Sequence, residues 1–236
     1  MEKSALQEII NFQQQSVTDI FATAGSHREA VILSVADAHQ WFDKLRKKLS
    51  SFKHIACNRG CGWCCRQKVS LTYAETFIIG WYVEEKITPG LVKDNIKLNV
   101  AQRWQNEDRL DSPARFATGI PCPFLDTGEN LCLIHLVRPF SCRWYESLDE
   151  LACKQPALQN SPKVNIPHDP RTQQLADAVE KGMLLGFKEQ GLSNSNLIMT
   201  GALTTFWNDK NCFLKWRANQ ELFKDCQIAT NTDHRG

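Results

Sequence analysis

The chain has 236 residues, 42% of them hydrophobic, which is enough for one sizeable core or at most two small domains. Its net charge of +2 and its isoelectric point near 8.0 are too mild to imply nucleic acid as a partner. The N-terminus carries acidic residues and no long apolar stretch, so we expect no signal peptide. No apolar run approaches the roughly 18–20 residues that span a bilayer, so we expect a cytoplasmic protein without a membrane partner.

The first part of the chain predicts two helices. Residues 4–24 carry apolar side chains at helical spacing, and Gly25 ends this run. Ser26 is a suitable N-cap, with Glu29 as its capping-box partner, and a second helix then extends to about Ser50. The cations near the end of the second helix suit a helix C-terminus, so they indicate a solvated face in preference to a nucleic-acid patch.

The rest of the chain is predicted to be mostly helical, because strands and helices do not alternate as a parallel sheet requires and no repeats are present. A capping box of Thr72 and Glu75 marks the start of an apolar helix. In chain order, the expected elements are a β-prone stretch at 68–72, that apolar helix, a polar helix at 91–110, a loop at 111–131, one or two helical turns at 132–138, a proline-rich linker at 154–170, and helices at 171–190, 195–208 and 210–226.

These elements predict a mainly α protein with three parts in one compact unit. An N-terminal helical pair occupies residues 1–56, and an irregular cysteine-rich metal-binding core occupies residues 57–155. A linker and C-terminal helices follow at 156–236. We expect the core to be packed between the N-terminal and C-terminal helices.

The chemistry of the chain is concentrated in a run of nine residues that holds four thiols, Cys57, Cys61, Cys64 and Cys65. Gly60 and Gly62 leave the backbone between them free to fold around something small. Converging thiolates bind zinc or iron–sulfur clusters, and cytosolic thiols stay reduced. We therefore interpret the run as part of a metal site. The alternative is the disulfide framework of a secreted protein, which the expected compartment disfavours.

A second group of thiols follows downstream at Cys122, Cys132 and Cys142. The seven thiols together exceed the four that a tetrahedral zinc ion or a four-iron cluster needs. The side chains of the vicinal pair Cys64 and Cys65 diverge by ~100° on a helix or ~180° on a strand, so the pair serves two ions more naturally than one. The three thiols beyond the four that one ion or cluster needs favour a two-metal site with shared thiolates, or one cluster with spare thiols.

The charge balance of such a site points to arginine. Seven thiolates carry −7 and two divalent ions carry +4, which leaves −3 to be offset. Arginine is the cation that stays charged where water is scarce. The arginines within a few residues of the thiols are Arg59, Arg66, Arg138 and Arg143. Each could equally be an ordinary surface charge.

Four further residues are weighed as ligands. His135 follows Cys132 by three residues and could be a ligand, although a packed or hydrogen-bonded histidine is the commoner role. Cys153 is a spare candidate. Cys212 and Cys226 lie in apolar helical surroundings, so we expect inert buried thiols there.

The order of these motifs resembles a known family. The motifs are Cys57-x3-Cys61-Gly-x-Cys64-Cys65, Val69-Ser-Leu-Thr72 with Glu75, Cys122-x-Phe124-Leu125, Cys132-x-Ile134, Arg138-Pro139 and Cys142-Arg143. Over residues 57–146 they resemble the cysteine-cluster proteins with a zinc- or iron-chelating domain. The resemblance implies that the seven cysteines are the metal ligands, but it implies no agreed reaction. One departure is His135, where the family usually has an aromatic residue, often Tyr.

The leading function is therefore metal binding, with zinc or iron held by thiolates in a mononuclear or multinuclear site. The alternative is an iron–sulfur enzyme or accessory protein that modifies a protein or peptide, because flagellin lysine methylases look distantly similar in their cysteine cluster. Radical enzymes that use S-adenosylmethionine share the Cys57-x3-Cys61-x2-Cys64 spacing, but they place it in an α/β barrel that this chain does not predict. A closed ligand set would favour metal binding alone, and a pocket beside the cluster would favour an enzyme.

Overall fold

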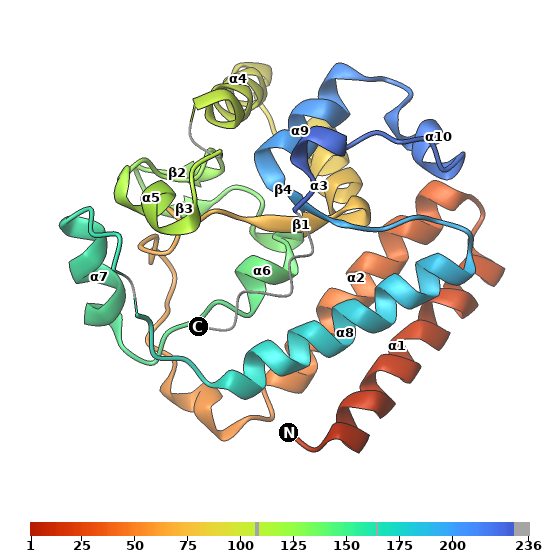
Figure 1. Cartoon of the computed structure of the whole chain (residues 1–236), viewed down its shortest axis with the longest axis horizontal. Helices are drawn as coiled ribbons and strands as arrows, with labels where there is room; N and C mark the ends of the chain where they lie inside the picture. Colours follow the sequence, from red (N-terminus) through yellow and green to blue (C-terminus); the bar gives the residue numbers. More distant parts are fainter. Residues whose placement is uncertain (107–108, 164, 229–236) are drawn as a thin grey trace.

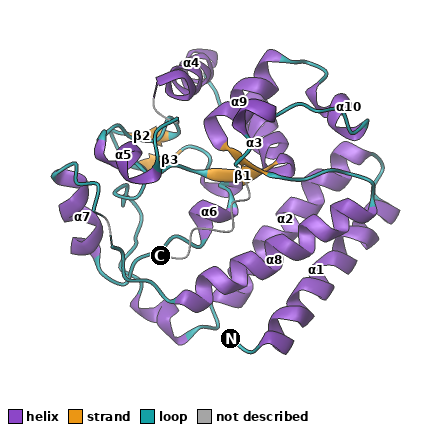
Figure 2. Cartoon of the chain, in the orientation of Figure 1, coloured by secondary structure: helices purple, strands orange, loops and turns teal. Residues whose placement is uncertain are grey.

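The computed structural model describes residues 1–106, 109–163 and 165–228, and it is mainly α, as predicted (Figure 2). The α-helices are α1 (Lys3–Thr23), α2 (His27–Arg46), α3 (Tyr73–Lys86), α4 (Gly90–Asn106), α5 (Ser112–Ala117), α6 (Phe140–Arg143), α7 (Glu150–Leu158), α8 (Pro170–Glu189), α9 (Met199–Asn208) and α10 (Cys212–Arg217). Short 3-10 turns are η1 (Ser50–His54), η2 (His135–Val137) and η3 (Lys224–Cys226). Two antiparallel pairs of strands complete the fold: β1 (Ser70–Thr72) with β4 (Asn196–Ile198), and β2 (Leu125–Asp126) with β3 (Leu131–Cys132).

Both N-terminal helices form where they were predicted, and Ser26 is the N-cap of α2, but Glu29 bonds the Gly25 N–H and not that of Ser26, so the predicted capping box is incomplete. The Ser26 side chain accepts a hydrogen bond from the Glu29 N–H at 3.1 Å, and the Glu29 carboxylate accepts one from the Gly25 N–H at 2.9 Å. Helix α2 ends at Arg46, short of the predicted Ser50, because Leu49 adopts an extended backbone before the turn η1 begins.

Helix α8 packs along both α1 and α2 (Figure 1), so a C-terminal helix completes the N-terminal pair. Glycine makes this close approach possible. A Cβ at Gly182 would lie 2.4 Å from the Ile10 carbonyl oxygen, and one at Gly186 would lie 2.5 Å from the Val17 Cβ. One hydrophobic core runs from Val17 of α1 to Cys226 of η3.

The β-prone stretch before α3 forms strand β1, and its partner was not predicted. Residues 196–198 were expected to begin a helix, but they form β4, which pairs with β1 in the register Ser70 to Ile198. The backbone groups along β1 would otherwise need another partner inside the fold. Helix α9 begins only at Met199.

Three further expectations about element boundaries were wrong. Residues 111–131 were predicted as a loop, but Asp111 caps the short helix α5, whose first turn holds Pro113, and the hairpin of β2 and β3 follows. The proline-rich linker begins later than predicted, because Pro156 lies inside α7. The last helix ends at Arg217, since Asn219 adopts a left-handed backbone with φ of 53°. Within the described residues, every helix is too short or too polar to cross a membrane.

Candidate metal centre

Tight turns shape the first cysteine segment. The Cys61 N–H donates to the Asn58 carbonyl at 3.1 Å, and the Cys65 N–H donates to the Gly62 carbonyl at 3.1 Å. Gly60 lies between them with φ of +86°, a left-handed backbone that glycine adopts without strain. These turns bring the side chains of residues 57–65 into one small region.

Hydrogen bonds join this segment to the downstream cysteines. The Cys122 N–H donates to the Cys65 carbonyl at 2.5 Å, so the two segments run side by side at this point. Cys132 lies in strand β3 opposite Leu125, and the Leu125 N–H donates to the Cys122 carbonyl at 2.9 Å. Strand pairing therefore places Cys132 beside Cys122. Cys132 does not begin the helical turns predicted at 132–138, where only η2 is helical.

The chain beyond Cys142 returns to the first cysteine. The Ser147 N–H points at the Cys57 Sγ with a distance of 3.3 Å, and the Ser147 carbonyl accepts from the Ala56 N–H at 2.8 Å. Cys142 itself lies on α6, which is fixed to β1 because the Ser141 hydroxyl donates to the Ser70 carbonyl at 2.5 Å.

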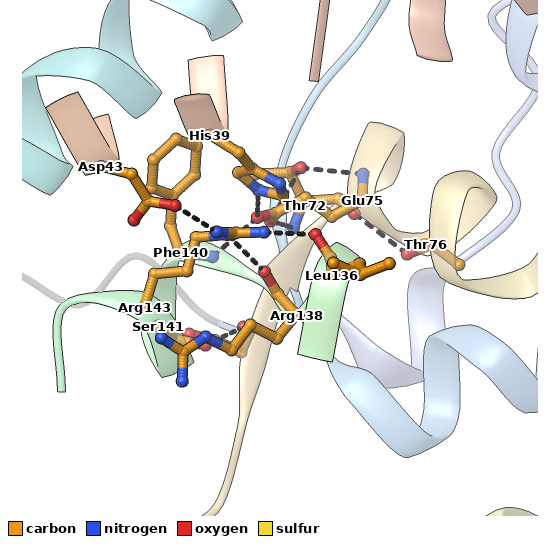
Figure 3. Close-up of polar contacts among 11 residues, drawn as sticks. His39, Asp43, Thr72, Glu75, Thr76, Leu136, Arg138, Phe140, Ser141 and Arg143 are labelled. Carbon is orange, nitrogen blue, oxygen red and sulfur yellow. Dashed lines mark hydrogen bonds and ion pairs between the residues drawn. The ribbon is translucent and has the colours of Figure 1, made fainter. Parts of the chain in front are cut away.

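A buried carboxylate holds α6 against α2 and α3 (Figure 3). Glu75 accepts hydrogen bonds from the Thr72 N–H at 2.9 Å and from the Phe140 N–H at 2.8 Å, and the His39 Nε2 lies 3.3 Å away. Burial alone would raise the pKa of Glu75, but the His39 ring and the two N–H groups outweigh burial and lower that pKa. Glu75 is therefore an ionised carboxylate that joins three elements at the N-terminus of α6.

Arg143 fastens the other end of α6. Its guanidinium donates to the Asp43 carboxylate at 3.0 Å, to the Arg138 carbonyl at 2.9 Å and to the Leu136 carbonyl at 2.5 Å (Figure 3). Burial lowers the pKa of Arg143 to about 10, which still leaves it charged at neutral pH. Arg143 thus positions the loop and helix that carry Cys142.

The seven predicted thiols influence one another electrostatically. Cys64 exchanges a hydrogen bond with Cys65. Its charge also acts on the thiols of Cys57, Cys61, Cys132 and Cys142. Cys122 interacts in turn with Cys65, Cys132 and Cys142. All ten cysteines of the chain are free thiols.

Burial makes most of these thiols costly to ionise. It raises the pKa of Cys57 to about 11 and that of Cys122 to about 12, and it raises the pKa of Cys142 well above its usual value. Cys64 is the exception, because the hydrogen bond with Cys65 lowers its pKa to about 7. The positive charge of a metal ion at this position would favour the thiolate form over the neutral thiol, so coordinating thiols would lose their protons.

The thiols are neighbours, but they do not form a closed ligand shell. Among the residues that the structure describes, no three Cys, His, Asp or Glu side chains converge closely enough to hold a metal ion. The chemistry of the donor set nevertheless fits zinc or iron, since thiolates are the ligands that both favour. A bound ion would have to draw the thiols closer than they lie here.

Arg138 supplies a second observation that fits an anionic centre. Its charge favours the thiolate forms of Cys64, Cys132 and Cys142, and at Cys132 and Cys142 it partly opposes the rise in pKa that burial causes. Its Nε is buried and has no hydrogen-bond partner among the described residues. A thiolate-rich cluster with surplus negative charge would provide that partner.

The other three predicted arginines have different surroundings. Arg59 is exposed, and Arg66 donates to the Ala157 carbonyl at 2.7 Å. Arg143 serves the scaffold described above. Sequence proximity alone could not separate these roles, because neighbouring side chains point in different directions.

The structure also places the residues that were left open. Cys153 of α7 lies near Cys57, Cys61 and Cys64, and their charges act on one another. His135 is exposed, and its ring has no hydrogen-bond partner in the described part of the chain. Cys212 and Cys226 are each 1% exposed, as expected for buried packing thiols. Cys153 is therefore the residue that this geometry adds to the seven.

Comparison with known proteins bears on the same segment. Residues 56–164 match the family model described as "CxxCxxCC: Putative zinc- or iron-chelating domain". The match confirms the family that the cysteine pattern predicted. This CxxCxxCC segment contains all seven predicted thiols and extends past the predicted span to include Cys153. Comparison with curated proteins gave no significant match, and neither did comparison with solved structures.

Proposed function

We propose that this protein binds zinc or iron through the thiolates of two chain segments that together form one centre. The observation that carries the proposal is the hydrogen bond from Cys122 to Cys65, which brings the second segment to the first. The match to a zinc- or iron-chelating domain supports it independently. The proposed ligands are Cys57, Cys61, Cys64, Cys65, Cys122, Cys132 and Cys142.

The distribution of the thiols favours two metal ions over one. The charges of Cys61 and Cys153 act on the thiol of Cys57, and the charge of Cys61 acts on that of Cys153. The charge of Cys122 acts on the thiols of Cys65 and Cys142, and the charge of Cys132 acts on those of Cys122 and Cys142. Two four-coordinate ions need eight ligands, so the seven proposed thiols suffice only if one of them bridges both ions. The metal would serve a structural or sensing role, in the reducing cytoplasm where thiols persist.

A second candidate is an iron–sulfur protein that assists the modification of a protein or peptide. The observation that favours it is a cleft lined by Arg66, the residue next to Cys65. A pocket beside a metal centre is a common arrangement in enzymes.

Anaerobic purification, elemental analysis and an absorption spectrum test the metal proposal. We expect at least two metal ions per chain. Iron–sulfur clusters absorb visible light and respond to reduction, whereas zinc has no redox chemistry, so the spectrum distinguishes them. A colourless protein with one zinc ion, and with the surplus thiols freely titratable, would rule out the two-metal centre.

Single substitutions test whether both segments contribute. Cys61→Ser and Cys142→Ser should each lower the bound metal, because each removes a ligand from a different segment. Cys226→Ser is the control, since Cys226 is a free thiol that is more deeply buried than Cys61 or Cys142 and lies outside the proposed ligand set, and it should keep full metal content. If Cys142→Ser keeps all its metal while Cys61→Ser loses it, the downstream segment is not part of the centre.

A further inference from the structure

A cleft of about 480 Å³ opens between α7 and the loop that leads to Cys122. The cleft is shallow and largely open to solvent. The residues that line it include Arg66, Ile120, Pro121, Leu158 and Asn160. It lies outside the proposed ligand set, although Cys65 and Cys122 each adjoin a lining residue in the sequence.

The cleft is positively charged. Arg66 is held in place because its Nη1 donates to the Ala157 carbonyl at 2.7 Å and lies 3.3 Å from the Asn160 side-chain oxygen. Its Nη2 and Nε have no protein partner among the described residues, so they remain available to a ligand. Arg115 donates hydrogen bonds to the backbone carbonyls of two residues that line the cleft, Arg66 and Ile120. Among the residues that the structure describes, none of those that line the cleft is acidic.

The rest of the wall is apolar. Leu158 is 63% exposed and Ile120 is 38% exposed, and both face the same cleft with Pro121 beside them. Covering such side chains with a hydrocarbon group is favourable by about 25 cal/mol per Å² of apolar surface removed from water.

Two left-handed residues set the spacing of the walls. Gly119 has φ of +70°, and a Cβ there would lie only 2.3 Å from the Asn160 side-chain oxygen. Asn160 has φ of 49° at the end of α7. The two turns therefore touch, and the Asn160 side chain is directed to Arg66. The charged group and the apolar walls are held at a fixed distance.

We infer that this cleft binds a carboxylate that carries a short apolar group. The carboxylate pairs with the Nη2 and Nε of Arg66, which present the fork that carboxylates accept. The apolar group covers Ile120 and Leu158. One lining guanidinium balances one negative charge, which favours a carboxylate over a dianionic phosphate. A small branched organic acid and the C-terminus of a peptide that ends in leucine share this chemistry. The inference rests on the cleft alone and does not depend on the proposed function.

Titration of the full chain with isovalerate, followed by calorimetry or NMR, tests the inference. Isovalerate should bind saturably, and isoamyl alcohol should bind at least about tenfold more weakly, because a hydrogen-bonded charge is worth roughly 1.5–3 kcal/mol. Arg66→Met should weaken isovalerate binding to a similar degree. A peptide that ends in leucine, compared with its C-terminal amide, shows whether the preferred source of the carboxylate is a peptide.

Two leucines of α7 provide a matched pair of variants. Leu158→Ser should weaken isovalerate binding several-fold because it removes apolar wall. Leu151→Ser should leave binding unchanged, since Leu151 is 57% exposed on the same helix but does not line the cleft. Equal binding of isoamyl alcohol, tighter binding of inorganic phosphate, or equal effects of the two leucine variants would each overturn the inference. These comparisons decide it even if Arg66→Met fails to fold.

Discussion

Glu75 shows how one side chain can serve both local and long-range structure. The sequence predicts it as half of a capping box, and the structure confirms that role at the start of α3. The same carboxylate also accepts from the Phe140 N–H and contacts His39. A local motif could predict the first role only, because residues 65 positions away become neighbours through the fold.

Replacing Glu75 by glutamine should therefore destabilise the protein by about 2 kcal/mol, since it removes a buried charge that accepts hydrogen bonds from several donors. Urea unfolding monitored by circular dichroism measures the change. Glu29→Gln is the matched control, because Glu29 occupies the same capping position on α2 but is exposed, and it should cost no more than about 0.5 kcal/mol. Equal losses in the two variants would mean that Glu75 acts only as a helix cap.

The cysteines differ from Glu75, because their shared role could be predicted from the sequence while their local neighbours could not. Their number, spacing and order predict one centre and a family that the comparison confirms. What the sequence could not predict is the approach of Cys122 to Cys65 or of Cys153 to Cys57. Those depend on turns and on strand pairing, which bring together residues far apart in the chain.

At the scale of elements, the long helices with caps were predicted well, and the short elements were not. Strand β4 exists because pairing with β1 satisfies its backbone groups, and α5 is a short helix that depends on the cap from Asp111; neither has a strong periodic pattern. Pro113 is a case in point. A proline in a polar stretch predicts a loop, but in the first turn of a helix it costs nothing.

The segment from Ser112 to Cys132 is the part of the fold most dependent on bound metal under the proposed function. Its only strands, β2 and β3, contain two residues each; Cys122 lies shortly before β2, and Cys132 is the last residue of β3. A hairpin this short is at most marginally stable by itself. Two of the proposed ligands therefore hold its ends.

Removal of metal should make residues 111–131 the first site of proteolysis, before α1, α2 and α8 unfold. Binding of structural zinc contributes roughly 10 kcal/mol or more, which exceeds what such short elements supply. Limited proteolysis with and without a chelator, followed by mass spectrometry of the fragments, locates the first cut. Unchanged cleavage and unchanged melting after the metal is removed would show that the segment orders itself without it.

At the scale of the whole molecule, the cysteine segments are fixed to a helical scaffold by buried polar groups. Helix α2 contributes His39 and Asp43, α3 contributes Glu75, and α6 contributes Arg143 (Figure 3). His39 is the titratable group at the centre of this cluster. Burial is the main cause that lowers its pKa, and the charge of Arg143 lowers it further, while Glu75 and Asp43 act in the opposite direction.

The lowered pKa of His39 predicts that the protein loses stability as the pH falls. In the unfolded chain His39 takes up a proton near pH 6.5, whereas the folded protein resists protonation until lower pH. Above about pH 6.5 the free energy of unfolding should therefore keep the full contribution of neutral His39. Below that pH it should decline, by at most about 1.4 kcal/mol per pH unit for this group. Urea unfolding between about pH 7.5 and 5 should show a shallower decline in His39→Gln than in the wild type. The exposed His54→Gln should follow the wild type. Because all three proteins keep every cysteine, parallel curves for His39→Gln and the wild type would exclude His39 as a source of the acid sensitivity.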